Sequence, residues 1–168
     1  MNPFEPHWYA VYTRSRHEKS VAVKLEEKQM EVFLPLRTVL RRWKDRRKEI
    51  RVPLFTSYVF VHMALSERLR VLQTPGVVLI LSEGSKPIPI PQDQIAAIEK
   101  LVSSGFKYDP YPYLKEGTQV NVVRGPLQGI TGILIEKRKQ HLLVLSVDLI
   151  QQSAALQVDI SDTDVAGM

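Results

Sequence analysis

The sequence contains no cysteine among its 168 residues. Disulfide bonds and thiolate metal sites are therefore excluded, and a cytoplasmic location is favoured. No apolar run approaches the ~18 residues of a membrane span, and the N-terminus lacks the layout of a signal peptide. We expect a cytoplasmic protein that has no membrane partner.

Residues suited to catalysis or metal binding are also scarce. The four histidines, His7, His17, His62 and His141, are scattered, and none has a second ligand at metal spacing. The chain shows no paired nucleophile and base and no phosphate-cradling loop. We therefore expect no metal site, no cofactor and no enzyme activity.

Positive charge is concentrated in one short segment. The net charge is +5, and residues 37–51 alone hold eight basic and two acidic residues. Residues 114–168, by contrast, hold five basic and six acidic residues. A polyanionic partner should therefore meet the N-terminal half of the chain.

Hydrophobic periodicity predicts an α+β arrangement in the first hundred residues. Ser15 and Glu18 form a Ser-x-x-Glu capping box, which predicts a helix from there to about Met30. A second helix is expected from about Gln92 to Ser103. Strands are expected at His7–Thr13, Val32–Leu36, Ser57–Met63 and Val77–Leu81, the last as an apolar strand buried on both faces. Helices on one face of an antiparallel sheet make an α+β sandwich.

The C-terminal part reads as a small all-β unit. Residues 105–113 contain two prolines and predict a fairly stiff linker, and four or five short strands separated by turn signals follow. Closure into a barrel would stabilise a unit of only about 50 residues. We predict domains at 5–105 and 114–168, joined by a linker at 106–113.

The turn within this second unit is the most specific motif. It lies between two strand-like runs and consists of Gly125, Pro126, Gly129 and Gly132. In detail it resembles a KOW motif. Further landmarks occur in order at Trp8-Tyr9, Pro53 to Val61, Thr74 to Val77 and the alternating prolines 87, 89 and 91.

Together these landmarks resemble the NusG/RfaH/Spt5 class, in which an NGN domain precedes a KOW domain. The resemblance implies an N-terminal NGN α/β sandwich and a small SH3-like KOW β-barrel. Residues 31–36 resemble the specialised UpxY branch, which is associated with polysaccharide operons. Pro75 stands where RfaH has a DNA-facing arginine, so RfaH-like sequence-specific recruitment is not implied.

The resemblance implies a monomeric transcription elongation or antitermination factor. Its NGN domain would bind the clamp helices of the largest RNA polymerase subunit, bridge the cleft, and reduce pausing or termination. Its KOW domain would bind a protein, such as a small-subunit ribosomal protein or a termination factor. The alternative is a ribosome- or RNA-binding KOW protein, although ribosomal KOW domains are usually strongly basic and this one is slightly acidic.

Site residues follow by matched position. The resemblance assigns polymerase contacts to Tyr12, Phe55, Tyr58, Phe60, Ile95 and Ile98, although several of these would serve equally as core residues. Contacts with non-template DNA or nascent RNA are expected from Arg14, Arg16, Lys24, Arg41, Arg42, Arg46 and Arg47. A solvated helix face and a solvated hairpin are the alternatives for these basic residues. Trp43 either stacks on a base or packs.

Overall fold

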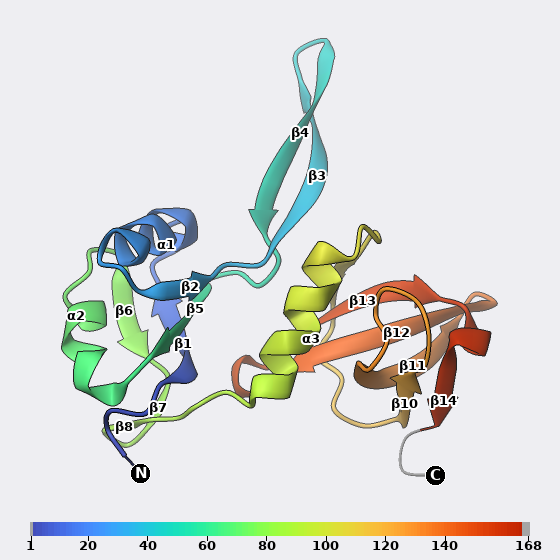
Figure 1. Cartoon of the computed structure of the whole chain (residues 1–168). Coiled ribbons are helices and arrows are strands. Elements are labelled where there is room, and N and C mark those ends of the chain that lie inside the picture. The colour runs from blue at the N-terminus through green and yellow to red at the C-terminus, as the bar shows by residue number, and fades with distance from the viewer. Residues whose placement is uncertain (1, 166–168) are drawn as a thin grey trace. The chain divides into compact units, whose positions relative to one another are not determined.

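The computed structural model describes residues 2–165. The chain forms two compact units (Figure 1). The first comprises the residues up to 34 together with 55–92, and the second comprises residues 35–54 together with those from 93 onward.

The first unit is built on a four-stranded antiparallel sheet of order β2-β5-β1-β6. Its strands are β1 (His7–Thr13), β2 (Glu31–Phe33), β5 (Tyr58–Met63) and β6 (Val77–Ile80), and its helices are α1 (Glu18–Glu27) and α2 (Arg68–Leu72). A short 3-10 turn (Leu65–Glu67) precedes α2, and the two-residue strands β7 (Ser82–Glu83) and β8 (Lys86–Pro87) pair with each other.

The sheet presents alternate residues to α1. Val21 and Leu25 of α1 are buried in one cluster with Tyr9, Val11 and Val59 of the sheet. The intervening residues of β1 and β5 face the other way because side chains alternate along a strand. The two tyrosines and Phe60 that were expected to bind a partner therefore share the face opposite α1.

The predicted capping box at the start of α1 is wrong. The N-cap residue is His17, which makes no side-chain capping bond, and the helix begins at Glu18. The Glu18 carboxylate instead accepts a hydrogen bond of 3.0 Å from the backbone N–H of Ser57, and the residue is only 5% exposed. Ser57 has a positive φ of 68°, and this tertiary bond outcompetes a local cap.

The expectation of a fully buried strand near residue 80 is also wrong. Strand β6 lies at the edge of the sheet, and Val78 and Leu79 are 49% and 41% exposed. A continuous apolar run can equally belong to an edge strand, and periodicity alone could not distinguish the two cases.

The second unit contains a ribbon, a helix and a six-stranded antiparallel sheet. The ribbon is β3 (Leu36–Trp43) with β4 (Arg46–Pro53), and the helix is α3 (Gln92–Ser103), which matches the prediction. The sheet has the order β14-β10-β11-β12-β13-β9. Its strands are β9 (Asp109–Tyr111), β10 (Thr118–Val122), β11 (Thr131–Lys137), β12 (Gln140–Val147), β13 (Gln152–Val158) and β14 (Thr163–Val165). The 3-10 turns Asp148–Ile150 and Ile160–Asp162 separate the last three strands.

The α+β class and the all-β character of the C-terminal part are thus confirmed. The predicted linker contributes strand β9, which pairs with β13. The two compact units also group the ribbon and most of α3 with the C-terminal sheet. Compactness does not establish which segments fold alone, so the domains at 5–105 and 114–168 stay a prediction, and residues 166–168 lie outside the described part.

Candidate functional site

Two tyrosines form the exposed aromatic end of the first unit's sheet. Tyr12 on β1 lies directly opposite Tyr58 on β5, and their ring centroids are 5.5 Å apart. Tyr12 is 37% exposed and Tyr58 is half-buried. Burial, and then the neighbouring Tyr12, raise the pKa of the Tyr58 hydroxyl above its usual value. This tyrosine pair offers a large, rigid surface with a polar tip on each ring.

Phe60 lies two residues after Tyr58 on β5, on the same face of the sheet, and packs with two further phenylalanines. Phe60 is fully buried and Phe55 is 1% exposed. The Phe60 ring is stacked 6.1 Å from Phe33 and meets Phe55 edge-on at 6.3 Å. These phenylalanines fix the strands that carry the tyrosines.

The two isoleucines assigned to the same surface lie on α3. Ile95 and Ile98 are both 0% exposed. In this conformation neither isoleucine side chain is presented to solvent, and their polymerase contact stays a prediction.

A basic turn adjoins the tyrosine pair along the chain. Residues 14–17 connect β1 to α1, and Arg14 and Arg16 are exposed. The backbone N–H of Arg14 donates to the carbonyl of Gly76 at 2.9 Å, and the N–H of Thr13 donates to the carbonyl of Ser57 at 2.8 Å. These bonds hold the two arginines at the end of the sheet that carries Tyr12 and Tyr58. Lys24, by contrast, is half-buried in the last turn of α1, about two turns further along that helix.

The remaining basic site residues lie on the β3–β4 ribbon. Arg41, Arg42, Arg46 and Arg47 are all exposed, and the turn at its tip consists of Lys44 and Asp45. The tip of the ribbon is therefore a two-residue turn. Trp43 beside it is 68% exposed, so this ring does not pack.

The KOW-type turn is closed by backbone hydrogen bonds. The N–H of Gly129 donates to the carbonyl of Val122, and the N–H of Val122 donates to the carbonyl of Ile130, each at 2.8 Å. Gly125 has a φ of 88°, a conformation that favours glycine. Gly132 is required for a different reason, because a Cβ there would lie 2.8 Å from a Leu143 methyl carbon.

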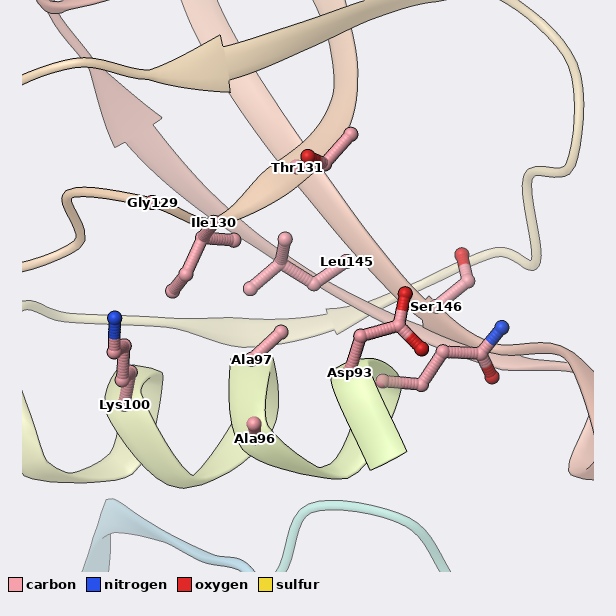
Figure 2. A pocket seen from close by; sticks show the side chains of 10 residues that line it. Asp93, Ala96, Ala97, Lys100, Gly129, Ile130, Thr131, Leu145 and Ser146 are labelled. Carbon is pink, nitrogen blue, oxygen red and sulfur yellow. The ribbon is translucent and has the colours of Figure 1, made fainter. Parts of the chain in front are cut away.

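Contacts between α3 and the C-terminal sheet were not foreseen from the sequence. The Gln94 side chain donates to the Asp148 carboxylate at 2.9 Å and accepts from the Asp148 backbone N–H at 3.1 Å. Lys100 donates to the carbonyl of Gln128 at 2.9 Å. Residues of α3 and of the C-terminal sheet line a cavity of about 180 Å³. Figure 2 shows Ala97 and Lys100 of α3 facing Ile130 and Leu145 of the sheet unit. Such long-range pairs of polar residues carry no signal in a single sequence.

The described residues offer no other obvious chemistry. Residues 2–165 contain no group of three or more His, Asp or Glu side chains placed to hold a metal ion. Within the same residues, no helix has both the length and the apolar character needed to cross a membrane. The features left to explain function are the tyrosine pair, the basic turn and the basic ribbon.

Known proteins resemble the chain over most of its length. A protein-family model described as "Transcription termination factor nusG" matches residues 6–99. The transcription termination/antitermination protein NusG of Thermus thermophilus is 30% identical over 149 residues, covering 77% of this chain and 81% of that protein. Its namesake from Campylobacter jejuni is 27% identical over 163 residues, covering 90% and 92% of the two chains.

A solved structure shares the fold. The structure described as "Domain interaction in Thermotoga maritima NusG" superposes with a TM-score of 0.60 at 20% identity, covering 98% of this chain and 99% of that one. These matches do not distinguish the UpxY branch from the rest of the family, so membership of that branch stays a prediction. With more than half of its residues matched by the family model, the chain belongs to the NusG family of transcription factors.

Proposed function

We propose that this protein is a transcription elongation and antitermination factor that binds RNA polymerase through the tyrosine pair. The observation that carries this proposal is the exposed Tyr12–Tyr58 ring pair on adjacent central strands. Exposed aromatic rings on a rigid support are typical of interface hot spots. The family's curated relatives, named transcription termination/antitermination proteins, support the same role.

The clamp helices of the largest polymerase subunit are the proposed docking element. Phe55 and Phe60 would support the strands that carry the tyrosine pair, and Ile95 and Ile98 would contribute only if α3 presented them. Once docked, the protein would bridge the polymerase cleft and reduce pausing or termination by holding it closed. The factor itself needs no catalytic group for this role, and the cytoplasm is its proposed location.

Nucleic acid is the second proposed partner. Arg14 and Arg16 are exposed beside the tyrosine pair, and the ribbon carries the strongest positive charge of the chain. Non-template DNA or nascent RNA would supply the complementary phosphates. Lys24, half-buried on α1, is the weakest member of the predicted set. The C-terminal sheet would serve a protein partner, a small-subunit ribosomal protein or a termination factor, with the chain acting as a monomer.

Polymerase binding is tested by a pull-down of the full chain with isolated clamp helices. Truncating a hot-spot residue costs about 2 kcal/mol or more of binding free energy. Tyr12→Ala combined with Tyr58→Ala should therefore weaken binding at least about 30-fold.

A matched control is available on the same unit. Val23 and Leu72 are exposed apolar residues on the helices, at 53% and 42%. Their replacement by alanine removes exposed apolar surface away from the tyrosine pair and should leave binding unchanged. Undiminished binding by a folded tyrosine double variant would refute the docking surface.

A further inference from the structure

The β3–β4 ribbon has one face that combines an aromatic ring with positive charge. Directly opposed residues of an antiparallel pair point their side chains to the same side, and so do residues two apart on one strand. Trp43 is opposite Arg46, and Arg41 is opposite Lys48. These four side chains form what we call the tryptophan face of the ribbon.

The other face of the ribbon differs in composition. Arg42 is opposite Arg47, and Leu40 is opposite Glu49. This face has no aromatic ring, and the Glu49 carboxylate offsets part of its positive charge. The ribbon is therefore not uniformly basic, and its two faces are expected to contribute differently to nucleic-acid binding.

Packing does not account for Trp43. The side chain is 68% exposed, and none of the aromatic and cation–π contacts within residues 2–165 involves it. An indole ring is large and mostly apolar, so leaving it in water sacrifices burial that a core position would provide. Its ring face is free to stack on a ligand.

The cations around the ring are equally free. Arg41, Arg46 and Lys48 are exposed, and the ion pairs of the described residues include none of them. A planar ring flanked by three unpaired cations on a two-stranded support is complementary to an unpaired base and its adjoining phosphates.

We propose that the tryptophan face binds single-stranded nucleic acid, with one base stacked on Trp43 and neighbouring phosphates held by Arg41, Arg46 and Lys48. A duplex offers no equivalent ligand, since its base faces are covered by the neighbouring pairs and only unstacked bases present a free face. The inference deepens the proposed function and rests on it, because an elongating polymerase exposes separated DNA and emerging RNA.

The ring is tested by binding of the full chain to a labelled single-stranded oligonucleotide, as DNA and as RNA, and to the matching DNA duplex. Stacking of one base is worth about 1–3 kcal/mol, so Trp43→Ala should weaken single-strand binding by roughly 5- to 150-fold. Trp43→Tyr, which keeps an aromatic face, should restore most of the affinity. Whichever single strand, DNA or RNA, binds with the higher affinity is identified as the natural ligand.

The charges are tested by a matched pair of double variants. Arg41→Gln with Lys48→Gln removes one opposed pair of cations from the tryptophan face, and Arg42→Gln with Arg47→Gln removes the adjacent pair from the other face. Each lost phosphate contact lowers the log–log salt slope by about 0.7 for single strands. The first variant should therefore flatten the slope by about 1.4. The second should flatten it by clearly less, because its face has no aromatic ring and carries the Glu49 carboxylate.

Intrinsic fluorescence gives an independent readout. The chain has two tryptophans, and Trp8 is only 5% exposed, so quenching by added oligonucleotide should report Trp43 and disappear in Trp43→Phe. Two results would overturn the inference. One is an equal loss of oligonucleotide affinity in both double variants with no loss in Trp43→Ala. The other is a duplex that binds as tightly as the single strand. Pull-down of polymerase by Trp43→Ala separates the two proposals, because this variant should still bind through the tyrosine pair.

Discussion

At the scale of single residues, Glu18 shows how tertiary structure overrides a local motif. The Ser15-x-x-Glu18 spacing predicts a cap, yet the Glu18 carboxylate reaches across to the N–H of Ser57. Ser57 begins the approach to β5, so this bond ties the start of α1 to the strand that carries Tyr58. The same bond positions the basic turn beside the tyrosine pair.

Glu18→Ala should therefore destabilise the protein, whereas Ser15→Ala should not. Leaving a buried N–H unsatisfied costs about 1–3 kcal/mol, and Ser57 is only partly buried, so the lower half of that range is expected. Ser15 is exposed and makes no capping bond, so its replacement should change the free energy of unfolding by less than about 0.5 kcal/mol. Urea denaturation of both variants measures the difference. Equal losses in the free energy of unfolding would instead support the Ser15–Glu18 capping box.

At the scale of elements, prediction succeeded where the pattern was both long and local. Strand β1 and helix α3 have the predicted bounds. A seven-residue run rich in aromatic and β-branched residues favours a strand, and a 3.6-residue apolar stripe over twelve residues favours a helix. The prediction that β6 is buried on both faces failed because an apolar run does not reveal whether other segments pack over both faces of the strand. Strand β9 was missed because a proline-containing segment can pair at a sheet edge, a position the sequence does not mark.

The candidate site was predictable to a similar degree. Tyr12 and the ribbon arginines are exposed and Tyr58 is half-buried, so these side chains are accessible, but their binding roles stay predictions. The assignment of Trp43 and Arg46 to one face of the ribbon needed the register, which depends on the position of the turn. Burial of Phe55 needed the tertiary packing against Phe60.

Helix α3 yields a prediction of its own. Gln94 makes two hydrogen bonds to Asp148, so Gln94→Ala should loosen α3 from the C-terminal sheet. Each net hydrogen bond contributes about 0.5–1.5 kcal/mol, and the exposure of Asp148 favours the low end. Amide hydrogen exchange of the full chain should show faster exchange along α3 and unchanged exchange along α1.

The control for this prediction lies on the same helix. Glu99 is exposed, and Glu99→Ala should leave exchange along α3 unchanged. Equal acceleration in both variants would refute a specific role for the Asp148 contact, because alanine raises helix propensity at both positions.

At the scale of the whole molecule, the question is whether the C-terminal part keeps its β structure. In RfaH the corresponding domain can refold into a helical hairpin that masks the polymerase site. Here β12 pairs with β13 over seven residue pairs. Leu156 and Val158 are two residues apart on β13, so they share one face of the strand. In a helix the same two residues would point to nearly opposite sides.

The glycines of the KOW-type turn oppose a helix as well. Gly125 and Gly129 have φ values of 88° and 91°, and each glycine would cost about 1 kcal/mol inside a helix. We therefore expect the tyrosine pair to be available without a recruitment signal. The three α-helices within residues 2–165 have 10, 5 and 12 residues, so far-ultraviolet circular dichroism of the full chain should indicate roughly one-sixth helix. A substantially higher helix content, falling when polymerase is added, would show that a masked helical form exists and that the KOW-type sheet is only one of two folds.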